Sequence, residues 1–277
     1  AWWSRIFSFY VPDDKDHIKL RTLCRLFRDA LKPPPLWTTF PHPNYPTLNL
    51  LMDALNSAYE KAPTYTPKIV FIMKGTFHIP VTKDEDGDDQ NYVTIGYPII
   101  MIGAGQDTTT IHGGFKIEGM KEEEKEVSLQ DMTMMGSSWN GLSTCNNSNG
   151  LSILCDSMTF TQCGLFGVYV NNTKGRLINC VITKCGASGI YCSQNVLVEL
   201  KGSQTKVDGN VTSGNSYHQG LQTSSKSRIH LLFPLTKESV STNNHSGRNY
   251  GGCGEIAIVD GDGAVIKIIN EVKEDKY

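Results

Sequence analysis

The sequence predicts a mainly β protein, a right-handed parallel β-helix solenoid with about 22–26 residues per coil and short N-terminal helices. Three observations support this fold class. Short apolar runs alternate with turn residues from residue 68 almost to the end of the chain. Similar segments recur at a spacing in the low twenties, which is typical of solenoids. Helical periodicity is confined to the region before the first strand-like run.

Two stretches near the N-terminus have the periodicity of amphipathic helices. In residues 20–31 the apolar side chains recur every three or four positions, and Pro33-Pro34-Pro35 then ends the pattern. A second stripe occupies residues 47–60, with Thr47 as a suitable N-cap. We therefore divide the chain into a helical segment over residues 1–45 and a solenoid over residues 46–277 that includes the second helix.

The repeat is clearest where residues 159–169 are set above residues 181–191. Two cysteines, four glycines and two tyrosines then match at a separation of 22 residues: Cys163 and Cys185, Gly164 and Gly186, Gly167 and Gly189, Tyr169 and Tyr191. The preceding unit fits the same template, with Gly141 lying 26 residues before Gly167. Each unit contains three short strand-like runs, so we expect one coil of a solenoid per unit.

Stacked coils explain why like residues recur. One coil cannot bury its inward side chains alone, whereas coils about 4.8 Å apart place equivalent residues in contact. This predicts two internal ladders, one of Met134, Phe160 and Ile182 and another of Leu142, Val168 and Ile190. The recurring glycines should mark corners that need a positive φ or a close approach of two backbones.

Charge and cysteine placement exclude several classes of partner. With 26 basic and 28 acidic residues the net charge is -2, so we expect no nucleic-acid partner. No apolar run is long enough to span a membrane. Six of the eight cysteines lie within the repeats and none forms a CxxC pair, so we expect structural thiols, no metal and no cofactor. Reduced thiols favour an intracellular location, in the cytoplasm or nucleus; secretion is the alternative.

The stretch from Leu50 to Gly119 resembles the first coils of pectin-lyase-like β-helices. The resemblance rests on a strand–glycine–strand run at residues 69–77 and on a following coil at residues 98–114. It implies that the helix at 47–60 caps the open end of the solenoid. Proteins of this fold include lyases, hydrolases, epimerases, adhesins and binding modules, so the resemblance implies the fold and no particular activity.

The N-terminal residues resemble part of an F-box. Trp3 to Phe9, Leu20 to Leu31 and Pro35-Leu36-Trp37 are similar to its middle helix, its following helix and its closing motif, although the leading Leu-Pro of the family is missing. The resemblance implies binding to the Skp-type adaptor of a ubiquitin ligase. The residues implied at that interface are Leu23, Phe27, Leu36 and Trp37.

Asp131 and Asp156 are the best candidates for a catalytic carboxylate pair. They lie one coil apart, and a polysaccharide lyase or glycoside hydrolase on this fold needs clustered carboxylates. However, Asp131 aligns with Ser157 in the repeat, so the two do not occupy one template position. We interpret them as turn residues and lean towards a protein without catalytic activity.

The repeat loosens between Leu200 and Leu231, where polar residues accumulate. Long polar excursions on a solenoid often meet ligands, so Tyr217, His218 and Arg228 are our candidate binding residues. The favoured hypothesis is an F-box/β-helix substrate adaptor that presents a solenoid face to a protein or glycan. The alternative is a carbohydrate-active β-helix enzyme or a lectin.

The adaptor hypothesis predicts a stoichiometric complex with the Skp-type adaptor. Co-purification of the chain, extended upstream to its native start, measures this directly, and the double variant Leu36→Ala/Trp37→Ala should lose the complex. Failure of the extended chain to bind the adaptor would refute the hypothesis.

Overall fold

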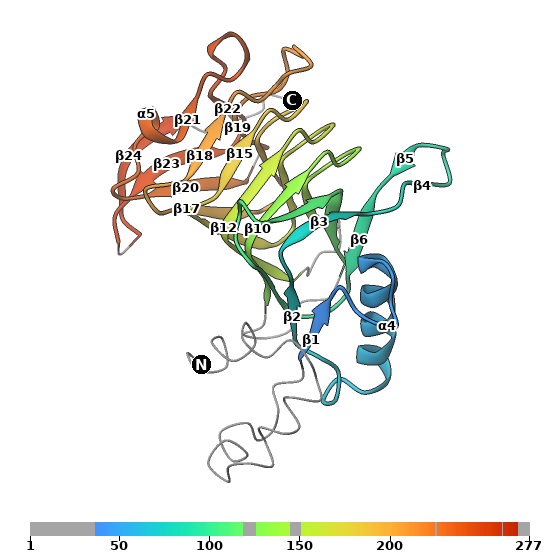
Figure 1. The fold of residues 1–277 in the computed structure, drawn as a ribbon. Coiled ribbons are helices and arrows are strands. Elements are labelled where there is room, and N and C mark those ends of the chain that lie inside the picture. Colours follow the sequence, from blue (N-terminus) through green and yellow to red (C-terminus); the bar gives the residue numbers. More distant parts are fainter. Residues whose placement is uncertain (1–36, 119–125, 145–150, 225, 262, 271–277) are drawn as a thin grey trace.

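The computed structural model describes residues 37–118, 126–144, 151–224, 226–261 and 263–270, and within them the chain is a parallel β-solenoid. Its strands form a 15-stranded sheet, a 7-stranded sheet and a small 2-stranded sheet. The large sheet bends within its two longest strands, so that three faces surround one core (Figure 1). Every pairing between successive coils is parallel, as the repeat predicts.

Each face contains one strand from most coils. The first face comprises β1 (Trp37–Phe40), β2 (Ile69–Ile72), β7 (Ile100–Gly103), the first halves of β10 (Glu126–Met135) and β12 (Ser152–Thr161), β14 (Lys174–Ile178), β17 (Leu197–Lys201), β20 (Arg228–Leu232), β23 (Glu255–Val259) and β24 (Val265–Asn270). The second face comprises β3 (Gly75–His78), β8 (Thr109–His112), the second halves of β10 and β12, β15 (Val181–Thr183), β18 (Lys206–Asp208) and β21 (Ser241–Thr242). The third face is β6 (Tyr92–Ile95), β9 (Gly114–Ile117), β11 (Leu142–Thr144), β13 (Val168–Asn171), β16 (Ile190–Ser193), β19 (Leu221–Thr223) and β22 (Tyr250–Gly252).

The core consists of the internal ladders that the repeats predict. Met134 pairs with Phe160, which in turn pairs with Ile182 in the next coil. On the third face Leu142, Val168 and Ile190 follow one another in the same way. All six side chains are fully buried, so both predicted ladders are confirmed.

The first strand of the solenoid begins ahead of the predicted boundary at residue 46. Trp37 pairs with Ile69 and Phe40 with Ile72, so β1 adds a strand to the first face. The run Trp-Thr-Thr-Phe combines aromatic and β-branched residues, which favour strands. The sequence places these residues in the helical segment 1–45; residues 1–36 of that segment lie outside the described residues.

The helix α4 (Leu48–Lys61) covers the N-terminal end of the core. The Thr47 side chain caps it by accepting a hydrogen bond from the Leu50 amide at 3.3 Å. Side-chain amides of Asn49 and Asn56 donate to the carbonyls of Tyr92 (2.5 Å) and Thr94 (2.9 Å) in β6. Because β6 is the edge strand of the third face, these bonds satisfy backbone groups that another coil would otherwise pair.

The opposite end of the solenoid is closed by a strand of reversed direction. The strand β24 pairs antiparallel with β23, and the turn-forming residues around Asp260–Gly263 connect the two. The acidic residues 84–88 likewise form a hairpin loop, between β4 (Thr82–Lys83) and β5 (Asp89–Gln90). The only further helices among the described residues are the short α5 (Lys237–Val240) and the 3-10 helix η1 (His245–Gly247).

The loosened stretch between Leu200 and Leu231 continues the solenoid. Its strands β18 and β19 pair in register with the coils on either side. The polar residues between them form a longer connection, which hid the repeat in the sequence. Two buried asparagines support this region: the Asn210 amide donates to Asn244 Oδ1 at 2.9 Å, and Asn244 Nδ2 donates to the carbonyl of Val207 at 3.1 Å.

The described cysteines of the repeat are buried thiols. Cys155, Cys163, Cys180, Cys185 and Cys192 are buried and free, and Cys253 is half-buried. Burial raises the pKa of the Cys180 thiol to about 12. A thiol of that kind stays protonated and unreactive near neutral pH, because the thiolate is the nucleophile.

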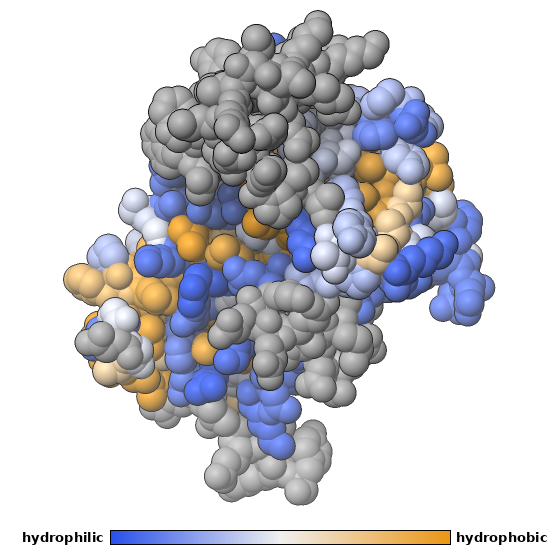
Figure 2. Space-filling model, turned by 90° about the horizontal axis from the view of Figure 1, so that it is seen from below, coloured by the Kyte–Doolittle hydropathy of each residue, from blue (hydrophilic) through white to orange (hydrophobic). Residues whose placement is uncertain are grey.

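The surface alternates between polar bands and apolar areas, as the view from below shows (Figure 2). Large apolar side chains are exposed on β24, where Val265, Ile266 and Ile268 are 51%, 57% and 46% exposed. Such residues on a terminal strand are typical of surfaces that meet other molecules. None of the helices in the described residues combines the length and apolarity required to cross a membrane.

Close approach between coils, and not a positive φ, explains why Gly167 and its equivalents recur at a regular spacing. A Cβ placed on Gly167 would lie 2.2 Å from Ile182 Cγ2 and 2.8 Å from the Gly189 carbonyl oxygen. We expect Gly167→Ala to lower the free energy of unfolding by about 1–3 kcal/mol through overpacking. The control Gly261→Ala adds its Cβ where no heavy atom lies within 4 Å. Equal denaturation midpoints for both variants would contradict this account.

Candidate functional site

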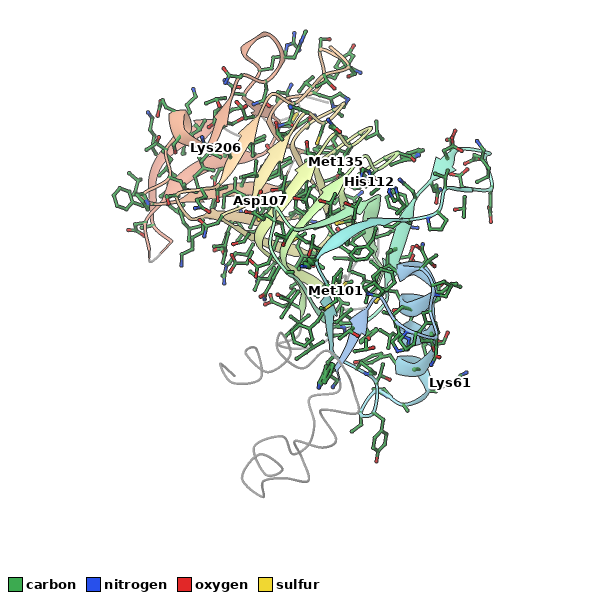
Figure 3. The ribbon with its side chains drawn as sticks, viewed as in Figure 1. Lys61, Met101, Asp107, His112, Met135 and Lys206 are labelled. Atoms are coloured by element: carbon green, nitrogen blue, oxygen red, sulfur yellow. The ribbon has the colours of Figure 1, made fainter. Side chains whose placement is uncertain are left out.

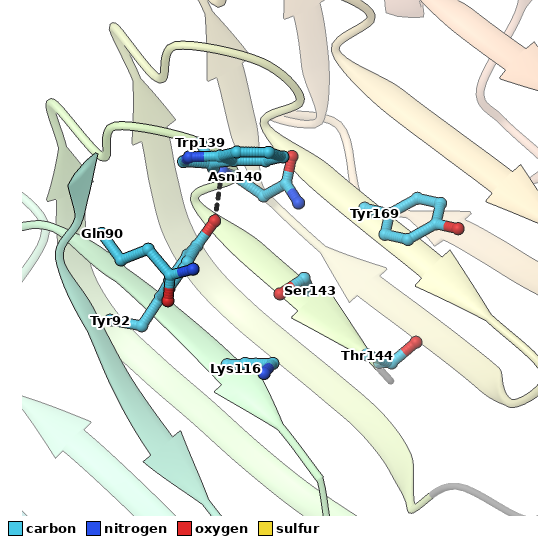
Figure 4. A pocket seen from close by; sticks show the side chains of 8 residues that line it. All are labelled: Gln90, Tyr92, Lys116, Trp139, Asn140, Ser143, Thr144 and Tyr169. Carbon is cyan, nitrogen blue, oxygen red and sulfur yellow. Dashed lines mark hydrogen bonds between the residues drawn. The ribbon is translucent and has the colours of Figure 1, made fainter. Parts of the chain in front are cut away.

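A groove of about 250 Å³ opens on the third face of the solenoid (Figure 4). Strands of four consecutive coils, β6, β9, β11 and β13, and the turn between β10 and β11 contribute its walls. We call it the Trp139 groove; its lining residues are Gln90, Tyr92, Lys116, Trp139, Asn140, Ser143, Thr144 and Tyr169. Aromatic, amide and hydroxyl groups thus share one concave surface, as in many ligand sites.

The alternation of side chains along each strand sets which residues face the groove. Phe115, Leu142 and Val168 are stacked in the core and fully buried. The residues that follow them, Lys116, Ser143 and Tyr169, therefore point outward in a second row that is also in register. The inward row fixes the fold and leaves the outward row available for binding.

Hydrogen bonds from Asn91 hold the turn that carries Trp139. The Asn91 Oδ1 atom accepts from the Ser138 backbone amide at 2.8 Å and from its hydroxyl at 3.1 Å. Its Nδ2 atom donates to the carbonyl of Gly136 at 3.2 Å. The Trp139 carbonyl then accepts from the Leu165 amide of the next coil at 2.7 Å. The turn is thus fixed on both sides, and the half-buried indole is presented to the groove.

Tyr92 and Asn140 meet at the wall of the groove (Figure 4). The Asn140 amide donates to the Tyr92 hydroxyl oxygen at 3.2 Å, while Asn140 Oδ1 accepts from the Phe166 amide at 3.2 Å. Burial is the main cause that raises the pKa of Tyr92, so its hydroxyl keeps its proton near neutral pH. This hydroxyl accepts one hydrogen bond from the protein and retains a proton that it can donate.

An aromatic cluster continues the groove along the third face. Tyr169 and Tyr191 lie in register on neighbouring coils, with ring centroids 5.6 Å apart and ring planes at 24°. Phe166 contacts both rings, and His218 packs edge-on against Phe166 at 5.6 Å. Since Tyr169 also lines the groove, the two features form one aromatic surface.

The charge in the groove is balanced. Lys116 Nζ lies 2.5 Å from Glu118 Oε1, and both side chains are partly exposed. Among the eight described residues that line the groove, none carries a carboxylate. Those residues therefore do not supply the acid and base of glycoside hydrolysis.

The structure separates the three binding residues expected from the sequence. Tyr217 and His218 belong to the connection before β19; Tyr217 is 79% exposed, and His218 joins the aromatic cluster. Arg228 begins β20 on the first face, where it pairs with Leu197 and Glu255. His218 thus lies beside the candidate site, and Arg228 lies on another face.

The expected carboxylate pair lies at a corner of the first face. Gln130, and not Asp131, pairs with Asp156. Asp131 and Ser157 both have a positive φ, of 56° and 53°, which marks the bend within β10 and β12. Asp156 Oδ1 accepts from the Ser157 hydroxyl at 3.0 Å. This arrangement fits the turn interpretation of the two aspartates.

Of the residues implied at an adaptor interface, Leu23, Phe27 and Leu36 lie outside the described residues. Trp37 is described, and it starts β1 with its ring 6.1 Å from that of Phe71. The pairing with Ile69 commits its backbone to the solenoid sheet. The F-box resemblance of the remaining residues stays a prediction.

Sequence reasoning missed Trp139 and Asn140. They occupy the run Ser137-Ser138-Trp139-Asn140-Gly141, in which a large aromatic residue interrupts turn residues. Tryptophan in a polar turn next to a repeat glycine was the available signal. Its position over the third face depends on Asn91, which is 47 residues away from Ser138 in the sequence.

Comparisons with known proteins give a likeness in structure alone. No protein-family model matches the chain, and no curated protein is similar to it in sequence. Among solved structures, the chain is similar to the A-module of the mannuronan C-5 epimerase AlgE4 from Azotobacter vinelandii, with 11% identity and a TM-score of 0.33. The likeness covers 77% of this chain and 85% of that one.

The role of Asn91 predicts that Asn91→Ala will loosen the turn that carries Trp139. Loss of its three hydrogen bonds should speed amide hydrogen exchange at residues 136–141, as measured by mass spectrometry. Asn44→Ala serves as the control. Asn44 is exposed, its hydrogen bond to His42 is made by the backbone amide, and its side chain does not bond to the turn that carries Trp139. Unchanged exchange in Asn91→Ala would show that other contacts hold the turn.

Proposed function

We propose that the solenoid is a glycan-binding module and that the Trp139 groove is its binding site. The observation that supports this most is the combination of aromatic rings with amide and hydroxyl groups on one concave surface. A pyranose ring has an apolar face of C–H groups and a rim of hydroxyls. Aromatic rings can cover the first, and uncharged polar side chains can hydrogen-bond to the second.

The arrangement in the groove suits such a ligand. Trp139 and Tyr169 supply aromatic surfaces on two sides, and Ser143 lies between them (Figure 4). The amides of Gln90 and Asn140 and the hydroxyl of Tyr92 lie around these rings. All are carried by paired strands or by a turn fixed through hydrogen bonds, so little conformational entropy is lost on binding.

Binding is favoured over cleavage because of the side chains in the groove. The described lining residues contain no carboxylate, and Lys116 is engaged with Glu118. A balanced charge favours neutral sugars over strongly anionic ones. A glycan bound here would be recognised and released unchanged.

The proposal predicts that Trp139→Ala and Tyr169→Ala each weaken glycan binding at least about tenfold, which corresponds to about 1.4 kcal/mol. A glycan array identifies a ligand, and calorimetry then compares the variants. Tyr65→Ala is the matched control, because Tyr65 is 79% exposed and is not among the groove residues. Absence of binding to any glycan of the array, or full affinity in Trp139→Ala, would refute the proposal.

A further inference from the structure

We propose that His78 and His112 form a binding site for a late first-row divalent cation on the second face. The two residues end β3 and β8, and the strand register pairs them directly. Their imidazole rings are stacked, with centroids 4.5 Å apart and planes inclined by 13°. The site lies on a different face from the Trp139 groove, so it is independent of the proposed glycan binding.

The alternation along the two strands directs both imidazoles away from the core. Ile111 is fully buried and pairs with Phe77 in the core row. The following residues, His112 and His78, therefore point outward; His78 is exposed and His112 is half-buried. Met135 is the next residue in the same row and lies beside His112 (Figure 3).

The two side chains are close enough to share one ion once one ring turns. An imidazole nitrogen binds Zn²⁺ at about 2.0–2.1 Å, so two nitrogens on one ion can be at most about 4.2 Å apart. In the stacked arrangement the nitrogen lone pairs lie in nearly parallel planes and do not converge. Rotation of the exposed His78 imidazole about its side-chain bonds therefore has to accompany binding, and the exposed side leaves room for water ligands.

The chemistry of the two ligands also suits a late first-row cation. A neutral imidazole has the free lone pair that a metal needs, and it suits zinc, copper and nickel ions. In the part of the chain that the structure describes, no three His, Cys, Asp or Glu side chains are grouped to hold a metal. The pair would thus bind an exchangeable ion with two protein ligands.

Calorimetric titration of the whole chain with Ni²⁺ tests the proposal, because Ni²⁺ suits imidazole whereas thiolates select zinc. We expect one ion per pair, with affinity at least about tenfold weaker in His78→Ala and in His112→Ala. His245→Ala is the matched control, since His245 is an exposed histidine of η1 and is not stacked on another histidine. Its affinity should equal that of the parent chain.

A variant that preserves the fold separates binding from stability. His112→Gln keeps a polar planar side chain, so its thermal unfolding midpoint should match that of the parent chain while Ni²⁺ binding is lost. Retention of the parent affinity in His112→Gln or in His78→Ala would overturn the proposal. So would the absence of Ni²⁺ binding in the parent chain.

Discussion

Backbone pairing between successive coils is the constraint on which the rest of the structure depends. A strand of one coil finds its hydrogen-bond partners in the coils before and after it, because the other strands of its own coil lie on other faces. The parallel register then stacks equivalent positions, which is why Phe160 lies between Met134 and Ile182. The same stacking requires glycine at position 167, where the Gly189 carbonyl of the next coil approaches closely. Sequence repetition is the consequence of this pairing.

A solenoid built in this way must close its two ends. At the N-terminal end, α4 covers the core, and Asn49 and Asn56 bond to the carbonyls of the edge strand β6. At the other end, β24 reverses direction and pairs with β23. Both devices occupy backbone groups that could otherwise pair with another chain, and edge strands are prone to such association. Among the described residues, Val265, Ile266 and Ile268 of β24 expose apolar side chains at this second end.

The division between inward and outward rows separates stability from function. An inward residue can be replaced only by another apolar side chain that packs in the core, whereas an outward residue can vary without disturbing the core. The Trp139 groove uses the outward row of the third face, and the histidine pair uses that of the second. Each site needs side chains from at least two coils, so neither exists in a single repeat. The scaffold therefore supplies rigid positions, and the chemistry comes from residues that packing does not dictate.

The sequence by itself determined the solenoid, its coil length and the two internal ladders, because stacking forces like residues to recur at a fixed period. It also indicated His218 but gave no reason to group it with Phe166 and the two tyrosines. Only the tertiary structure placed Trp139 above the third face, through hydrogen bonds from Asn91, a residue two coils earlier. It likewise brought His78 beside His112, which are 34 positions apart and outside the clean repeats. Outward residues carry no periodic signal, since packing does not select them, so their neighbours follow from the register of the folded coils alone.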